Sequence, residues 1–161
     1  MDFIPHLQTW TKADISQGKW MIGIALFILL PLCILLIKAN NSLQKGMLIP
    51  LCLLFLMNVG YGSYLLISKP KYVTERMAQF QLNAGETIKN EVTKIKADDK
   101  SYTMTKYIWA GLLILSVVCF FILKKDYFQG LSLGFAIMFL GMLLIDVFLH
   151  HRLKSYLENF I

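Results

Sequence analysis

Four strongly apolar blocks, each long enough to cross a bilayer, constrain the fold of this chain more than any other feature. They cover residues 20–37, 46–68, 107–123 and 127–149, and each has charged or polar flanks. A membrane-spanning helix needs roughly 20 mostly apolar residues. Asp146 is the one formally charged residue inside a block. The sequence therefore predicts an all-α polytopic membrane protein with one domain and four transmembrane helices.

The composition supports a membrane protein over a soluble one. Hydrophobic residues make up 57% of the chain and charged residues 16%, whereas a soluble domain has about 45–50% apolar and about 25% charged residues. A soluble protein with four buried core helices is the alternative, but helices in so small a domain would still need a polar face. The first block starts late and no small-residue cleavage site follows it, so we expect a retained span rather than a signal peptide.

The distribution of basic residues predicts the orientation. Four spans place both termini on one side, here called side A, together with the long segment 69–106; the loops 38–45 and 124–126 lie on side B. Twelve of the 16 Lys and Arg residues lie on side A, which the positive-inside rule places in the cytoplasm. We expect a bacterial inner-membrane protein with both termini cytoplasmic. The lipid bilayer is its expected partner, and nucleic acid is not, because no separate domain would carry it.

Residues 70–100 have the spacing of an amphipathic helical arm between the second and third spans. Apolar residues recur every three or four positions and form one stripe: Met77, Phe80, Ala84, Ile88, Val92 and Ile95. Such a stripe is expected to lie on the membrane surface, to extend the spans outward, or to contact a partner chain.

Local signals divide this arm into two helices. Asn83 and Glu86 resemble a capping box around a break at Gly85, so we expect one helix from about Pro70 to Leu82 and a second to about residue 97. Residues 98–100 are then expected to form the turn into the third span. Glu91 and Lys94 are expected to be favourable neighbours on the helix surface.

Polar groups inside the spans are the candidate site residues, because such groups are costly in lipid and often functional. Asp146 and His150 lie four residues apart, which suits an acid–imidazole pair for proton transfer or cation binding, or a simple anchor for the helix end. Asn58 lies in mid-span and shares a face with Tyr61 and Gly62. That patch would either hydrogen-bond between helices or line a polar pathway.

Small residues and a proline mark helix packing. Gly130, Gly134 and Gly141 fall on one narrow stripe, which permits close approach of a helix from the same chain or from another copy. Pro31 is expected to kink the first span. The three cysteines, Cys33, Cys52 and Cys119, lie one each in the first three spans at similar depth. They would form either a soft metal site or redox pair, or serve only as small buried residues.

No motif names a reaction. The sequence has no nucleophile elbow, P-loop or dinucleotide fingerprint, and its histidines form no zinc pattern, so no cofactor or metal is predicted. The preferred hypothesis is a non-catalytic subunit that joins its own copies or another membrane protein and scaffolds, senses or regulates through the arm, as defence or immunity components do. One alternative is an oligomeric channel or transporter lined by Asn58, Tyr61 and Asp146. The other is an interfacial lipid- or quinone-acting enzyme that uses Asp146 and His150.

Overall fold

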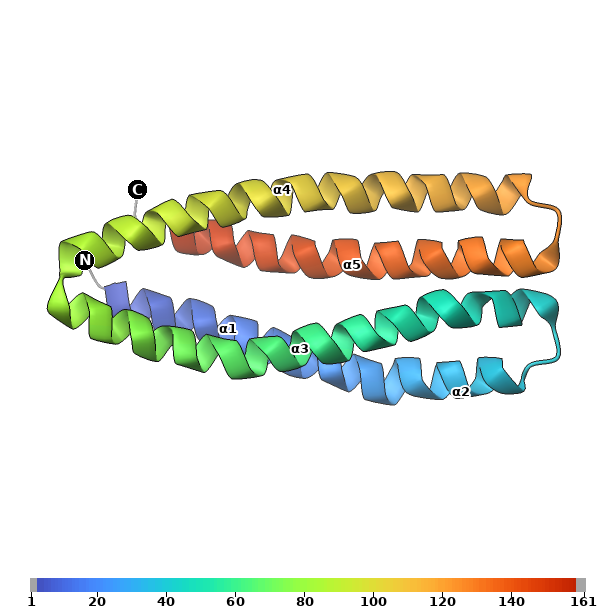
Figure 1. Ribbon diagram of the computed structural model, residues 1–161, viewed down its shortest axis with the longest axis horizontal. Coiled ribbons are helices and arrows are strands. Elements are labelled where there is room, and N and C mark those ends of the chain that lie inside the picture. The colour runs from blue at the N-terminus through green and yellow to red at the C-terminus, as the bar shows by residue number, and fades with distance from the viewer. Residues whose placement is uncertain (1–2, 159–161) are drawn as a thin grey trace.

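The computed structural model describes residues 3–158, which are helical apart from short connections at 39–41, 83 and 123–125 (Figure 1). The first rod comprises α1 (Phe3–Ile24), the π-helical turn η1 (Ala25–Leu29) and α2 (Leu30–Lys38). The other three rods are α3 (Ser42–Leu82), α4 (Ala84–Ile122) and α5 (Asp126–Glu158). All four are long and apolar enough to cross a membrane, which confirms the predicted all-α architecture at this level.

The rods are longer than a bilayer requires. The 41 residues of α3 and the 39 of α4 span about 60 Å each at 1.5 Å per residue, twice the hydrocarbon thickness of about 30 Å. Apart from Leu82 and Met104, the exposed large hydrophobic side chains all lie within the four predicted blocks. We therefore distinguish an apolar half (residues 20–68 and 107–149) from a polar half (residues 3–19, 69–106 and 150–158). This continuous apolar surface indicates an integral membrane protein.

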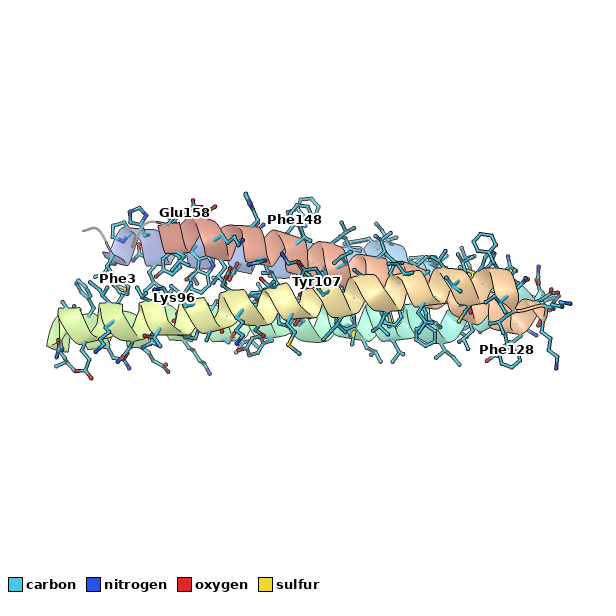
Figure 2. The ribbon with its side chains drawn as sticks, turned by 90° about the horizontal axis from the view of Figure 1, so that it is seen from above. Phe3, Lys96, Tyr107, Phe128, Phe148 and Glu158 are labelled. Carbon is cyan, nitrogen blue, oxygen red and sulfur yellow. The ribbon has the colours of Figure 1, made fainter. Side chains whose placement is uncertain are left out.

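Both termini lie at the end of the molecule where α3 meets α4, and the connections 39–41 and 123–125 lie at the opposite end (Figure 1). Figure 2 shows the same division, with Phe128 at one end and Phe3, Lys96 and Glu158 toward the other. At the joint between α3 and α4, Asn83 Oδ1 accepts from the Glu86 N–H at 3.1 Å, and Asn83 Nδ2 donates to the Glu86 carboxylate at 3.1 Å. The predicted cap at Asn83 is confirmed, but the Glu86 carboxylate bonds the Asn83 side-chain amide instead of the backbone N–H of a capping box. The break is at Asn83, and Gly85 lies inside α4.

The expected turn at residues 98–100 is wrong, because α4 continues through it without interruption. Two contacts explain the continuity. Lys94 donates to the Asp98 carboxylate at 3.2 Å, four residues along the same helix, which stabilises a helix, and Asp99 contacts His150 of α5 at 2.6 Å. The segment 70–100 is therefore an outward extension of α3 and α4 and not a separate arm.

The π-helical turn lies where a kink at Pro31 was predicted. The Leu30 N–H donates to the Ala25 carbonyl, five residues earlier, which is the spacing of a π-helix. Pro31 has no N–H, and its ring crowds the carbonyl of the residue four positions earlier. The wider turn relieves that crowding and separates α1 from α2.

Glycines bring α5 close to α3 of the same chain. The three glycines singled out in the sequence all face α3: Gly130, Gly134 and Gly141. A Cβ atom on Gly130 would collide with the backbone of Leu43, and one on Gly134 would lie 3.0 Å from Pro50. Only backbones without side chains between them approach so closely. The stripe therefore serves an internal contact.

Each half has its own core. The polar half buries Phe3, Leu7, Trp10, Ile95, Leu153 and Tyr156, with Phe80 and Ile88 packed against them. The Trp10 and Tyr156 rings stack with their centroids 4.7 Å apart. The apolar half buries Leu29, Cys33, Leu36, Leu51, Leu54 and Met138. Three residues of the apolar stripe, Phe80, Ile88 and Ile95, thus pack against the N- and C-terminal parts of the described chain.

Candidate functional site

Buried charged side chains tie the helices of the polar half together. Asp14 of α1 lies 2.6 Å from the Lys69 ammonium of α3, which also sits 3.9 Å above the Trp10 ring. Arg152 of α5 donates to the Ala13 carbonyl at 2.6 Å and lies 4.0 Å from Asp14. Helix α1 is therefore braced against both α3 and α5 by charge-assisted contacts.

Glu91 is a second brace, and the expectation of a surface pair with Lys94 is wrong. Its side chain is fully buried on α4, where it pairs with Arg76 of α3 at 3.1 Å and accepts a hydrogen bond from the Tyr72 hydroxyl. Burial, followed by the contact with Glu91, raises the pKa of Tyr72 above its usual value. The phenol therefore remains a proton donor to the carboxylate across the physiological range.

The predicted acid–imidazole residues are both buried on α5, but each has its partner on α4. Trp109 donates its indole N–H to the Asp146 carboxylate at 2.8 Å. His150 Nε2 lies 2.6 Å from the Asp99 carboxylate, and the Tyr102 ring stacks on the imidazole with centroids 5.9 Å apart. The spacing of four residues places Asp146 and His150 on one face, and α4 supplies a separate partner for each.

Asn58 and Tyr61 do not form one polar patch. Asn58 is buried and donates to the carbonyl of Leu54 in its own helix at 2.9 Å. Tyr61 is partly exposed and stacks on Tyr64 with centroids 5.9 Å apart. Their neighbour Gly62 has a packing role that the sequence did not reveal: a Cβ there would lie 2.9 Å from the Gly18 carbonyl of α1. Gly18 and Gly62 are visible in the sequence as small residues, but only the fold shows that they face each other.

Two of the three cysteines meet. The Sγ atoms of Cys33 and Cys52 are 3.7 Å apart, where α2 packs on α3. Residues 3–158 contain no group of three or more His, Cys, Asp or Glu side chains placed to hold a metal ion. The hypothesis of a three-cysteine metal site is therefore wrong, and a thiol pair is what remains of it.

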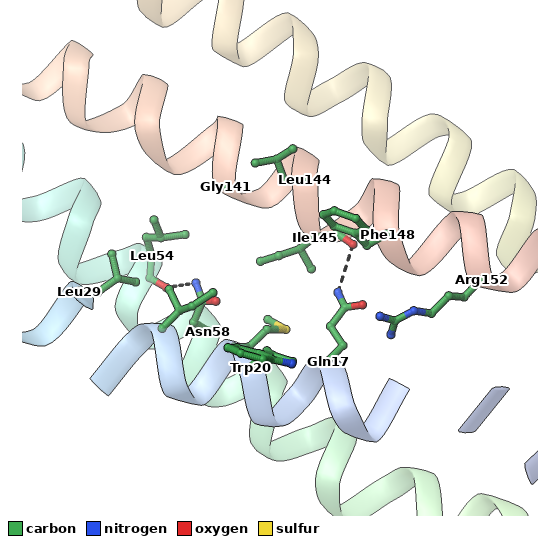
Figure 3. Close-up of a pocket in the computed structure, with 12 residues that line it drawn as sticks. Gln17, Trp20, Leu29, Leu54, Asn58, Gly141, Leu144, Ile145, Phe148 and Arg152 are labelled. Atoms are coloured by element: carbon green, nitrogen blue, oxygen red, sulfur yellow. Dashed lines mark hydrogen bonds between the residues drawn. The ribbon is translucent and has the colours of Figure 1, made fainter. Parts of the chain in front are cut away.

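A groove lies between α1 and α5, which make few contacts with each other, and α3 forms its floor (Figure 3). Its volume is about 450 Å³. Its wall is mostly apolar and includes Met21, Leu29, Leu54 and Phe148. The π-helical turn borders it through Leu29, and such turns are frequent at functional sites. The groove is therefore a candidate site for a small, mostly apolar molecule.

Polar groups concentrate at one end of the groove. Gln17 is 8% exposed, and its Nε2 donates to the Ile145 carbonyl at 3.4 Å, as the dashed line in Figure 3 shows. Gln17 Oε1 is buried without a hydrogen-bond partner within residues 3–158. Arg152 closes the same end, and Asn58 lies deeper along the wall. The groove thus combines an apolar length with a cationic, hydrogen-bonding end.

No family model, curated protein or solved structure matches this chain.

Proposed function

We propose that this chain is a non-catalytic integral membrane protein that scaffolds, senses or regulates through its polar half. In this proposal the apolar half spans a bacterial inner membrane, and the polar half and both termini lie in the cytoplasm, as the excess of basic residues there favours. The observation that carries the proposal is the continuity of α3 and α4, which run from one half into the other without a break. A shift of either helix in the membrane would therefore move the polar half.

The use of the polar side chains supports a structural role over a catalytic one. Asp14, Glu91 and Asp146 each contact a residue of another helix, so each carboxylate serves as a brace. An enzyme using Asp146 with His150 is less favoured, because the two side chains have separate partners. A pore lined by Asn58 and Tyr61 is less favoured, because one is buried and the other partly exposed.

The contact surface for a partner would be the outer face of α4. Lys89, Lys96 and Lys100 are exposed, and spacings of seven and four residues place them on one side of a helix. Ile95, Phe80 and Ile88 of the apolar stripe pack inside the protein itself, so little of the stripe is left for a partner. A basic face repels its own copy and suits an acidic surface. We therefore favour another membrane protein with an acidic cytoplasmic face as the partner.

Site-specific photo-crosslinking in cells tests this proposal. A photoreactive residue at exposed Thr93, beside the basic face, should give a discrete adduct with a partner chain. Reversal of Lys89, Lys96 and Lys100 to Glu should abolish the adduct. The matched control replaces three exposed lysines elsewhere on the polar half with Glu, and the adduct should then form as in the unmodified chain. These are Lys12, Lys71 and Lys154.

Two results would overturn the proposal. One is a chain that gives no adduct and remains monomeric in lipid nanodiscs prepared directly from the membrane. The other is ion flux through the purified protein in liposomes that is lost in Asp146→Asn, which would favour the channel.

A further inference from the structure

The groove between α1 and α5 has the depth of one bilayer leaflet. Arg152 and Gly141 border it on α5 and are eleven positions apart, or about 16 Å at 1.5 Å per residue. That is half of the hydrocarbon thickness of about 30 Å. The groove therefore runs from the boundary with the polar half to the middle of the apolar half. Its volume of about 450 Å³ falls within the range of small-molecule sites, about 300–1,000 Å³.

The charged end of the groove suits an anion. Arg152 uses one donor on the Ala13 carbonyl, and a guanidinium has five. The nearby Asp14 carboxylate is held by Lys69 at 2.6 Å and is 4.0 Å from Arg152. Because Lys69 pairs closely with Asp14, Arg152 is the cationic side chain that lines this end of the groove. The guanidinium fork matches carboxylate and phosphate groups, and the phosphate is the one that a membrane lipid supplies at this depth.

The unpaired acceptor adds a second requirement. Gln17 Oε1 is buried and unpartnered within residues 3–158, which is unfavourable for any polar atom. Gln17 lines the groove, so a donor on a molecule bound there would satisfy Oε1 while Nε2 keeps its bond to Ile145. A hydroxyl group beside the phosphate would provide that donor, whereas a choline headgroup has none.

We propose that the groove binds one anionic phospholipid from the side A leaflet, with an acyl chain along the apolar wall. The phosphate lies at Arg152, and a headgroup hydroxyl donates to Gln17. A phosphatidylglycerol-type lipid has both groups. This site stands independently of the partner proposed for the polar half.

Native mass spectrometry of the full chain, released from detergent in the presence of defined lipids, tests the site. With equal amounts of phosphatidylglycerol and phosphatidylcholine that share the same acyl chains, one phosphatidylglycerol per chain should be retained, with a preference of at least about five-fold. That factor corresponds to the effect of a single basic residue on an anionic lipid. Phosphatidylmethanol, an anionic phosphodiester without a hydroxyl, should bind more weakly than phosphatidylglycerol.

Matched variants separate the two ends of the site. Leu144→Trp fills the groove and should remove the bound lipid, whereas Leu140→Trp, at an exposed position one turn away outside the groove wall, should retain it. Arg152→Gln should abolish the preference for phosphatidylglycerol over phosphatidylcholine, and Lys154→Gln, an equal change of charge nearby, should not.

Two further variants keep the test decisive if Arg152→Gln fails to fold. Arg152→Lys should retain the anionic preference, and Gln17→Leu should equalise phosphatidylglycerol and phosphatidylmethanol. Equal retention of phosphatidylglycerol and phosphatidylcholine by the unmodified chain, or unchanged retention in Leu144→Trp, would overturn the proposal. Equal retention of phosphatidylglycerol and phosphatidylmethanol by the unmodified chain would overturn the role of Gln17.

Discussion

The contact between Gly130 of α5 and Leu43 of α3 allows a sharp test of how the rods are packed. A Cβ added at Gly130 would collide with the Leu43 carbonyl, whereas one added at Gly111 of α4 has nothing within 4 Å. Replacement of either glycine by alanine is the same chemical change inside a helix. The comparison of Gly130→Ala with Gly111→Ala therefore isolates the close approach of the two backbones.

The size of the effect follows from two terms. Alanine favours a helix over glycine by about 1 kcal/mol, so Gly111→Ala should increase the free energy of unfolding by about that amount. Overpacking costs about 1–3 kcal/mol, and the upper end applies at Gly130 because the obstacle is backbone that no rotamer change can move. Gly130→Ala should thus lower the free energy of unfolding by about 2 kcal/mol, about 3 kcal/mol below Gly111→Ala.

Unfolding by sodium dodecyl sulfate in mixed micelles, followed by far-ultraviolet circular dichroism, measures these free energies on the full chain. Gly60→Ala is a second control, because a Cβ there also meets nothing within 4 Å. If Gly130→Ala matched the two controls within about 0.5 kcal/mol, smaller than any overpacking cost, the rods would not be in backbone contact at Gly130.

Three further predictions concern the braces and the thiol pair. Glu91→Leu should lower the free energy of unfolding by about 3 kcal/mol, because it leaves the Arg76 guanidinium without its carboxylate partner. The double variant Glu91→Leu with Arg76→Met should recover most of that loss in the same unfolding assay. The folded-state pKa of Tyr72 is raised above the unfolded value of about 10. Its contribution to stability is therefore complete below about pH 10 and is lost as the pH rises toward the folded pKa. Between about pH 9 and about pH 12, the melting temperature of Tyr72→Phe should fall less steeply than that of the unmodified chain. Mild oxidation should join Cys33 to Cys52 without unfolding, detected as a linked peptide pair by mass spectrometry, and recovery of both thiols unmodified would contradict their approach.

Features that depend on neighbouring residues could be predicted from the sequence. Hydropathy predicts the four rods, because the free energy of transferring a segment into lipid depends only on the side chains within that segment. The Asn83–Glu86 cap was predictable because both partners lie within one turn. The turn at residues 98–100 was a wrong prediction for a related reason: a charged cluster resembles a loop until Asp99 meets His150, 51 positions along the chain.

The candidate sites depend on such distant contacts. The i, i+4 spacing correctly placed Asp146 and His150 on one face, but it did not indicate that Trp109 and Asp99 would hold them. Glu91 resembled a surface residue because its partners, Arg76 and Tyr72, lie on the preceding helix. The groove is a property of the diverging α1 and α5, which no local pattern contains.

The π-helical turn gives the first rod one surplus residue. Four buried residues follow one another at intervals of four: Met21, Ala25, Leu29 and Cys33. In a regular α-helix each interval of four would turn the buried side of the rod by about 40°. The wide turn at Ala25–Leu29 absorbs that rotation and keeps α2 facing α3. Deletion of a single residue within this turn would restore a regular α-helix and leave both flanking segments in register. A deletion elsewhere in the rod would rotate one segment by about 100° and expose its packed face to lipid.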